Sequence, residues 1–285
     1  MKKISINKRN FKDSNHGAAG VVVAILLIGL FFSGVTIVQT VYVPQWMEQK
    51  EAEHMDTVSN QFSQLKFAID TLSVAAQANN QISSPITLGG KEIPFFSATR
   101  SYGELNIMPN GCKITIVDNY GESVSINLGS IIYSSTNGYY IDQSYIYENG
   151  ALIISQSSGD ILAVPPAFSV GESESLSFNI IKLTDIGDKT STSGYGTYPL
   201  QTKFLDSDTE FINNVKEITL ITSYKQAWYN FFNDTLKTSF LNYSISNTID
   251  DDGIIITFHN SIVNLPELLV KTIEIECQIS PGWIQ

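Results

Sequence analysis

The chain has few of the residues with which enzymes do chemistry. Its 285 residues include only three histidines and two cysteines, and charged residues make up 16%. It also lacks the G-x-S-x-G, G-x-x-x-x-G-K-S/T, G-x-G-x-x-G and H-E-x-x-H patterns of nucleophilic, phosphate, dinucleotide and zinc sites. A Ser-His-Asp site would have to use His259, and nothing in the sequence supplies its other members. We therefore expect no enzyme, with no catalytic residue, cofactor or resident metal.

Basic residues are scarce outside the N-terminus. Residues 1–13 hold five of them against Asp13 alone, and the remaining 12 basic and 27 acidic residues lie from Glu48 onward, a local net charge of -15. Nucleic-acid binding needs clustered Lys and Arg to neutralise phosphates. The acidic bulk therefore predicts that no nucleic acid is a partner.

Charge is absent altogether between Asp13 and Glu48. Residues 18–43 would form a helix about 39 Å long at 1.5 Å per residue. That length exceeds the roughly 30 Å hydrocarbon core of a bilayer, and the apolar part of a secretory signal is shorter, about 7–15 residues. The sequence predicts a transmembrane helix over residues 18–43, with membrane lipid around it.

The charges flanking this segment predict its orientation. Basic residues precede it in a leader over residues 1–17, and acidic residues follow it from Glu48. The positive-inside rule then puts the N-terminus in the cytoplasm and the C-terminal part outside a single-pass cell-membrane anchor. Tyr42 and Trp46 fall where aromatic rings prefer the outer interface, and Pro44 predicts a kink.

A regular apolar stripe follows the membrane segment. Its members are spaced alternately three and four residues apart, which is typical of one helix face: Met55, Val58, Phe62, Leu65, Ile69, Leu72 and Ala76. We expect a stalk helix over residues 44–80. The stripe packs either on the chain's own globular domain or on neighbouring copies, and the sequence leaves both open.

Turn-forming residues and prolines predict a linker over residues 81–99, and residues 100–285 then alternate in a β pattern. Besides strands around 112–117 and 123–128, we expect strands at 130–134, 139–147, 151–156, 160–164, 175–183, 216–222, 254–259 and 270–279. Asn137-Gly138, Asn149-Gly150 and Ser158-Gly159 predict turns between them. The expected fold class is α+β: a long N-terminal helix, then a mainly antiparallel, sandwich-like outer domain.

One segment of this domain has helical spacing. Residues 223–237 place Tyr224, Ala227 and Trp228 on the same face as Phe231 and Phe232. We expect one amphipathic helix, capped by Ser223, whose aromatic stripe covers a sheet.

Four residues are candidates for covalent modification. Cys112 and Cys277 share the apolar phase of their strands, so they either form a disulfide outside the cytoplasm or remain two buried thiols. Asn233 and Asn242 begin N-x-S/T sequons.

Two acidic clusters stand out in the second half. Asp206, Asp208, Glu210 and Glu217 have the spacing of a calcium loop, but Phe211 occupies the position that requires glycine, so a solvated acidic loop is favoured. Asp250-Asp251-Asp252-Gly253 predicts a hairpin turn in which the glycine takes positive φ.

Several stretches together resemble the type IV pilin-like surface proteins of archaea. KRNFKDSNHG followed by AAGVVVAILLIGLFF resembles their basic leader and charge-free helix, and HMDTVSNQFSQLKFAI, SSPITLGG and IPFF are similar to the stalk and linker of an uncharacterised membrane-anchored group. SIIYSSTNGYYIDQSYIYENGALIISQ and SYKQAWYNFF are similar to later parts. The resemblance implies cleavage between Gly17 and Ala18 by a prepilin-type peptidase, with a cut at Gly20 as the rival. It implies no activity.

Two functions follow as hypotheses. The first is a pilin-like structural or surface-display subunit that is anchored by its N-terminal helix or assembled with copies of itself and other pilin-like subunits. The second is a permanently anchored module whose outer domain binds a glycan or a protein partner, with exposed tyrosines as contacts.

Overall fold

The structure of the protein is a computed structural model that describes residues 14–78, 80–90, 101–171, 175–184, 189–259 and 265–280, with side chains from Ala19 onward. The predicted leader therefore lies almost wholly outside the described residues.

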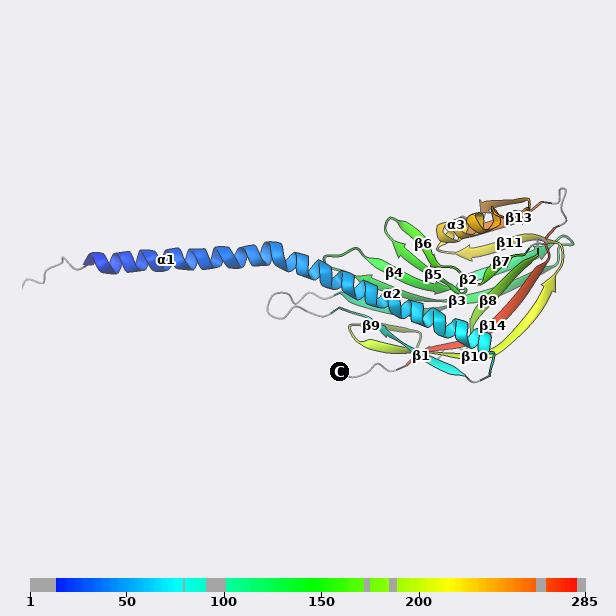
Figure 1. The fold of residues 1–285 in the computed structure, drawn as a ribbon, viewed down its shortest axis with the longest axis horizontal. Coiled ribbons are helices and arrows are strands. Elements are labelled where there is room, and N and C mark those ends of the chain that lie inside the picture. Colours follow the sequence, from blue (N-terminus) through cyan, green and yellow to red (C-terminus); the bar gives the residue numbers. More distant parts are fainter. Residues whose placement is uncertain are drawn as a thin grey trace, which may run out of the picture.

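The N-terminal part of the fold is one continuous helix. It comprises α1 (Ser14–Ile37), a π-helical turn (Val38–Tyr42) and α2 (Val43–Ala75). Pro44 has no N–H to donate to the carbonyl of Thr40, and a wider turn accommodates this lost hydrogen bond. Figure 1 shows the helix changing direction at this point, so the predicted kink is confirmed.

The helix ends earlier than predicted. Ala76 takes a left-handed conformation (φ 45°), and its N–H bonds to the carbonyl of Leu72 at 3.0 Å. The linker prediction is wrong over its first residues, because Gln81–Thr87 forms strand β1 and pairs with β10. Pro85 fits there because β1 is the edge strand of its sheet.

Strand β1 belongs to a five-stranded sheet. Its order is β1, β10 (Thr197–Ile212), β14 (Leu268–Ile279), β8 (Leu176–Thr184) and β7 (Phe168–Val170). Only β14 and β8 pair in parallel within this sheet. β10 was not predicted, because its polar C-terminal half hides the strand alternation.

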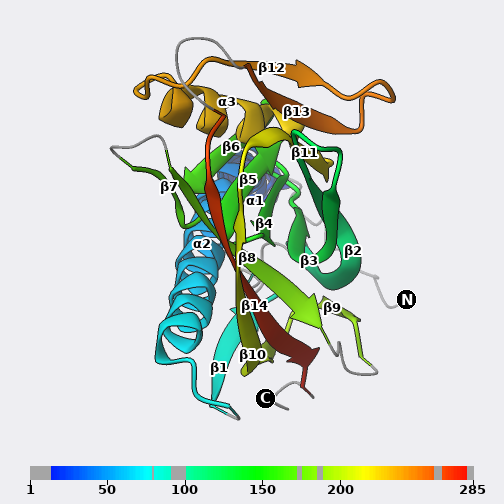
Figure 2. The same cartoon turned by 90° about the vertical axis from the view of Figure 1, so that its right-hand side faces the viewer.

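A nine-stranded sheet makes up the rest of the β structure, and all of its pairs are antiparallel. In sheet order its path is β12 (Tyr243–Asn247), β13 (Gly253–Phe258), β11 (Val215–Thr222), β2 (Tyr102–Asp118), β3 (Ser123–Thr136), β4 (Gln143–Glu148), β5 (Ala151–Gln156) and β6 (Gly159–Val164), while β9 (Ser191–Gly194) pairs with β2. The strand expected from residue 139 therefore begins at Gln143. Figure 2 shows the sheet curling around α3 (Lys225–Leu236), with β12 on one side of the helix and β6 on the other.

The prediction of an α+β fold with a mainly antiparallel β domain is confirmed. The sandwich arrangement is not confirmed, because helices fill the cores on which the two sheets pack. One core, which we call the α2 core, joins six stripe residues of α2 to side chains from both sheets, among them Ile86, Tyr133 and Ile275. The second, the α3 core, lies between α3 and both sheets.

This packing shows whether the apolar stripe of α2 contacts the chain's own domain or neighbouring copies. Six of its predicted members, from Met55 to Leu72, are at most 2% exposed within a single chain. The stalk thus packs on its own domain, and the domain begins near Val43, well before the expected boundary at residue 100.

The predicted helix near residue 225 is also confirmed. Its buried side chains are Ala227, Trp228, Phe232 and Leu236, and Tyr224, Tyr229 and Phe231 pack against the same core. Ser223 is not its cap; Tyr224 precedes the first turn, and the N–H of Tyr224 donates to the Thr222 hydroxyl at 3.1 Å.

Candidate functional site

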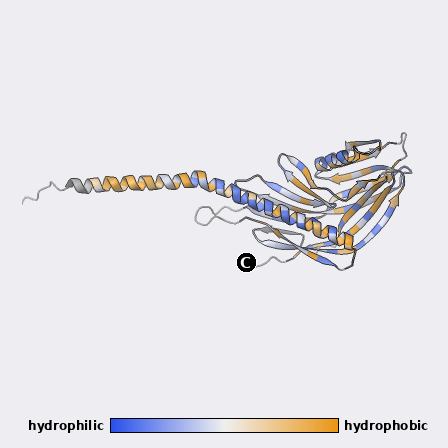
Figure 3. Ribbon diagram, in the orientation of Figure 1, coloured by the Kyte–Doolittle hydropathy of each residue, from blue (hydrophilic) through white to orange (hydrophobic). Residues whose placement is uncertain are grey.

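The most unusual surface of the molecule is that of α1. Its large apolar side chains from Val21 to Phe32 are 54–71% exposed on every side, and one continuous helix, Ala19–Ala75, is long and apolar enough to cross a membrane. Figure 3 shows the contrast between the uniformly hydrophobic α1 and the mixed surface of α2. An apolar surface this large is typical of a membrane-contacting or protein-contacting segment.

Three hydroxyl side chains of α1 and the π-helical turn find their hydrogen-bond partners within the helix. The hydroxyls of Ser33, Thr36 and Thr40 each donate to the carbonyl four residues earlier, at 2.8 Å. Such bonds remove the cost of placing a hydroxyl in hydrocarbon, so these three residues fit a lipid environment or a helix bundle equally well.

A buried carboxylate joins α2 to the strand ends beside it. Glu51 is 2% exposed, and its two oxygens accept the N–H groups of Gly138, Tyr139 and Tyr140 at 3.0, 2.7 and 2.7 Å. Charge-assisted bonds to a carboxylate are stronger than neutral ones. The connection between β3 and β4 is therefore held against the helix.

His54, one turn further along α2, is buried at the same junction. Its Nε2 lies 3.2 Å from the carbonyl of Leu88 and 3.0 Å from the hydroxyl of Tyr133, which itself donates to Leu88 at 2.7 Å. A carbonyl only accepts, so Nε2 carries the hydrogen. Burial lowers the pKa of His54, and the hydrogen bond to Leu88 and the charge of Glu51 offset part of that effect.

The α3 core contains a second buried carboxyl group. Glu148 is 0% exposed, and its Oε1 accepts the Thr222 hydroxyl and the Trp228 indole N–H, both at 2.7 Å. Burial raises the pKa of Glu148 to about 7, although hydrogen bonds from Thr222, Trp228 and Cys112 counteract this. This group ties α3 to the sheet.

The structure does not contain the predicted disulfide. Cys112 lies in the α3 core and Cys277 in the α2 core, and both are buried free thiols. The alternation that put both residues in the interior was correct, but it could not tell that β2 and β14 direct them into different cores. Burial raises the pKa of both thiols, which lowers their reactivity.

The two sequons differ in accessibility. Asn242 is exposed just before β12, whereas Asn233 is half-buried within α3, where its carbonyl accepts the Tyr243 hydroxyl at 3.2 Å. The Ser244 hydroxyl of the second sequon lies 2.9 Å from Nε2 of exposed His259. This places His259 at the surface as expected, and glycosylation stays a prediction.

The acidic run does not form a loop. Asp206, Asp208 and Glu210 lie along strand β10 and Glu217 lies on β11, so the calcium-loop spacing and the solvated-loop interpretation are both wrong. Among the described residues no group of three His, Cys, Asp or Glu side chains could hold a metal ion.

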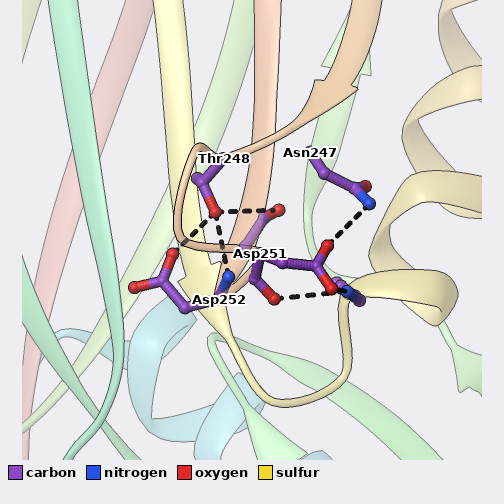
Figure 4. A network of polar contacts seen from close by, with 6 residues as sticks. Asn247, Thr248, Asp251 and Asp252 are labelled. Carbon is purple, nitrogen blue, oxygen red and sulfur yellow. Dashed lines mark hydrogen bonds and ion pairs between the residues drawn. The ribbon is translucent and has the colours of Figure 1, made fainter.

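The Asp250–Gly253 segment is the predicted hairpin turn, but the positive φ belongs to Asp251 (55°). Figure 4 shows how the turn is held: the Thr248 hydroxyl donates to Asp252 at 2.6 Å, and Asn247 donates to Asp251 at 2.8 Å. Lys225 forms an ion pair with Asp251. Gly253 is required for a different reason, since a Cβ there would meet the carbonyl oxygen of Leu220 at 2.2 Å.

Two open hollows flank Ile161 where the edge strand β6 meets α3. One, of about 470 Å³, is lined by Phe231 and Leu162 with Asn230 and Asp234, and the other, of about 350 Å³, is lined by Ile154 with Gln143, Gln156 and Gln226. They are shallow features beside a helix, with planar amide and carboxylate side chains at their rims.

Gly17 and Ala18, the predicted cleavage pair, lie within the first turns of α1, which begins at Ser14. Sequence reasoning missed Glu51, His54 and Glu148. Glu51 has a recognisable signal, because it stands four residues before Met55 and so continues the apolar stripe with a charge. Glu148 has none, since it precedes a turn like many surface glutamates.

No family model, curated protein or solved structure matches the chain. The resemblance to pilin-like proteins therefore remains an expectation from sequence.

Proposed function

We propose that the protein is a pilin-like structural or surface-display subunit, held at the cell membrane by α1 and presenting its β domain outside. The observation that carries this proposal is the contrast along one helix. The apolar stripe of α2, from Met55 to Leu72, packs on the chain's own domain, whereas α1 exposes its apolar side chains on every side. No described part of the same chain covers α1.

Lipid and neighbouring copies of α1 are both able to cover this surface. A charge-free helix loses little on leaving lipid for a bundle of like helices, because both surroundings are apolar. The bent, continuous helix also sets the β domain rigidly at the end of its anchor, which suits display or polymerisation.

The alternative is a permanently anchored module that binds a glycan or a protein. The hollows beside Ile161 favour it, since planar polar side chains such as Asn230 and Asp234 border an apolar floor there. In this alternative α1 never leaves the bilayer, and the leader is retained.

Processing of the leader separates the two functions. Removal of residues 1–17 would delete all five N-terminal basic residues, which otherwise hold that end at the cytoplasmic surface. Filaments sheared from cells should be visible by electron microscopy, and N-terminal sequencing of their subunit should begin at Ala18. Gly17→Trp should prevent both, and Gly20→Trp is the matched control that detects cleavage at the rival position. A mature protein that begins at Met1, in cells without filaments, would contradict the pilin-like subunit and support the permanently anchored module.

A further inference from the structure

The connection between β3 and β4, residues 137–142, is rigidly attached to the membrane-proximal part of α2. Three of its N–H groups donate to Glu51. Asn137 closes it from within, donating through its backbone to the Asp142 carboxylate at 2.8 Å and through its side chain to the carbonyl of Ile141 at 2.9 Å. The loop thus has one fixed position at the end of the domain nearest α1 (Figure 1).

This fixed loop presents apolar side chains to its surroundings. Tyr139 is 42% exposed and Ile141 is 53% exposed, whereas Tyr140 between them packs on the α2 core. A loop held by so many hydrogen bonds needs neither exposed side chain for its own packing.

The loop lies close to the level at which the membrane segment ends. Glu51 follows Val43 by eight residues and Trp46 by five, which is about 12 Å and about 7.5 Å of helix. The headgroup layer on each side of a bilayer is about 5–8 Å thick, the difference between a core of about 30 Å and a total of about 40–45 Å. Tyr42 and Trp46, whose rings are 6.0 Å apart, mark that layer on the helix.

We propose that residues 137–142 form a second membrane contact, in which Tyr139 and Ile141 enter the headgroup layer of the bilayer that holds α1. The proposal rests on the membrane anchoring proposed above. A tyrosine ring prefers this layer because one end is apolar and the other is polar. Residues 137–142 contain no Lys or Arg, so the contact does not require anionic lipid.

Two membrane contacts would restrict the orientation of the outer domain more than a single helix does. A single span permits the outer domain to tilt and to rotate about the helix axis, because tilt and rotation are set by interfacial anchors and packing. With the loop inserted, one side of the domain faces the lipid and the turn between β2 and β3 points away. Glu51 is the positioning residue of this contact.

Site-directed spin labelling of the full chain in phosphatidylcholine vesicles tests the proposal. A nitroxide on Ile141→Cys should be shielded severalfold from a water-soluble nickel chelate relative to Tyr120→Cys. Tyr120 is 82% exposed in the turn at the opposite end of β3, and the native cysteines are at most 2% exposed. Equal accessibility at the two positions overturns the proposal.

Two further variants separate the causes of failure. A label on Leu27→Cys reports on α1: if it lies in lipid while the Ile141 label is in water, the anchor stands and the loop contact is wrong, and if it lies in water, the anchor itself is wrong. Glu51→Gln in the Ile141→Cys background should raise chelate access while circular dichroism shows an unchanged fold. Unchanged access would contradict the role given to Glu51.

Discussion

At the scale of single residues, three buried ionisable groups join the elements of this protein. Glu51, His54 and Glu148 are each buried by the packing of a helix on a sheet, and their hydrogen-bond partners are backbone groups and neutral side chains. Glu51 fastens a loop and Glu148 fastens a helix, so the charges serve the attachment of elements to one another.

Glu148 should make stability fall as the pH rises. Burial raises the pKa of this carboxyl to about 7 in the folded protein, against 4.5 in the unfolded chain. Between these values the folded protein keeps a proton that the unfolded chain has lost, so the free energy of unfolding decreases by up to roughly 3 kcal/mol as the pH rises through the window. Glu148→Gln, whose amide oxygen still accepts from Thr222 and Trp228, should abolish this slope in denaturant titrations. An unchanged slope would show that Glu148 does not carry it.

His54 should have the opposite effect over a more acidic range. Because burial lowers the pKa of its imidazole below 6.5, the unfolded chain takes up a proton before the folded protein does. The free energy of unfolding should therefore fall as the pH drops below 6.5. In the Glu148→Gln background, His54→Gln should flatten this acid slope, and a slope that survives the substitution would argue that another group is responsible.

At the scale of elements, α2 is the helix on which the domain is built. Phe62 is 0% exposed, whereas Phe67, five residues later on the same helix, is 72% exposed. Phe62→Ala should cost about 3–5 kcal/mol of unfolding free energy, the usual range for a buried phenylalanine. Phe67→Ala is the matched control and should change stability by less than about 0.5 kcal/mol. Similar costs for the two variants would mean that α2 does not pack as described.

The sequence predicts elements well where one periodicity is unbroken. The 3–4 spacing from Met55 to Leu72 and the aromatic stripe of α3 both gave helices, because each buries one face along its whole length. Strand β10 has no such unbroken periodicity. Its N-terminal half packs on the α2 core through Leu200 and Phe204, whereas Asp206 to Glu210 face the solvent. Pairing with β14 keeps that polar half extended, and pairing is a long-range fact that local spacing does not contain.

At the scale of the whole molecule, the outer domain includes the second half of the long helix. A fragment of residues 100–285 lacks the six buried stripe residues of α2 together with β1. At about 1.5–3 kcal/mol for each buried side chain, that loss is comparable to the entire stability of a typical domain. The fragment should be unfolded or aggregated by circular dichroism. A fragment from Val43 should give a cooperative melt, and a folded 100–285 fragment would contradict the shared core.

The candidate site was predictable only in part. The apolar span can be recognised in the sequence from its 26 consecutive uncharged residues, and this property does not depend on the fold. The junction at Glu51 and the loop at residues 137–142 arise from contacts between positions nearly 90 residues apart. The separation of Cys112 from Cys277 likewise depends on which core each strand faces, and alternation gives only inside or outside.

Thiol labelling in cells tests whether α1 spans the membrane with the β domain outside. Tyr120→Cys should react with a membrane-impermeant maleimide in intact cells, since residue 120 is exposed and the two native thiols are buried. Leu27→Cys should stay unlabelled even after the cells are permeabilised. Labelling of Tyr120→Cys only after permeabilisation, or ready labelling of Leu27→Cys, would contradict this topology.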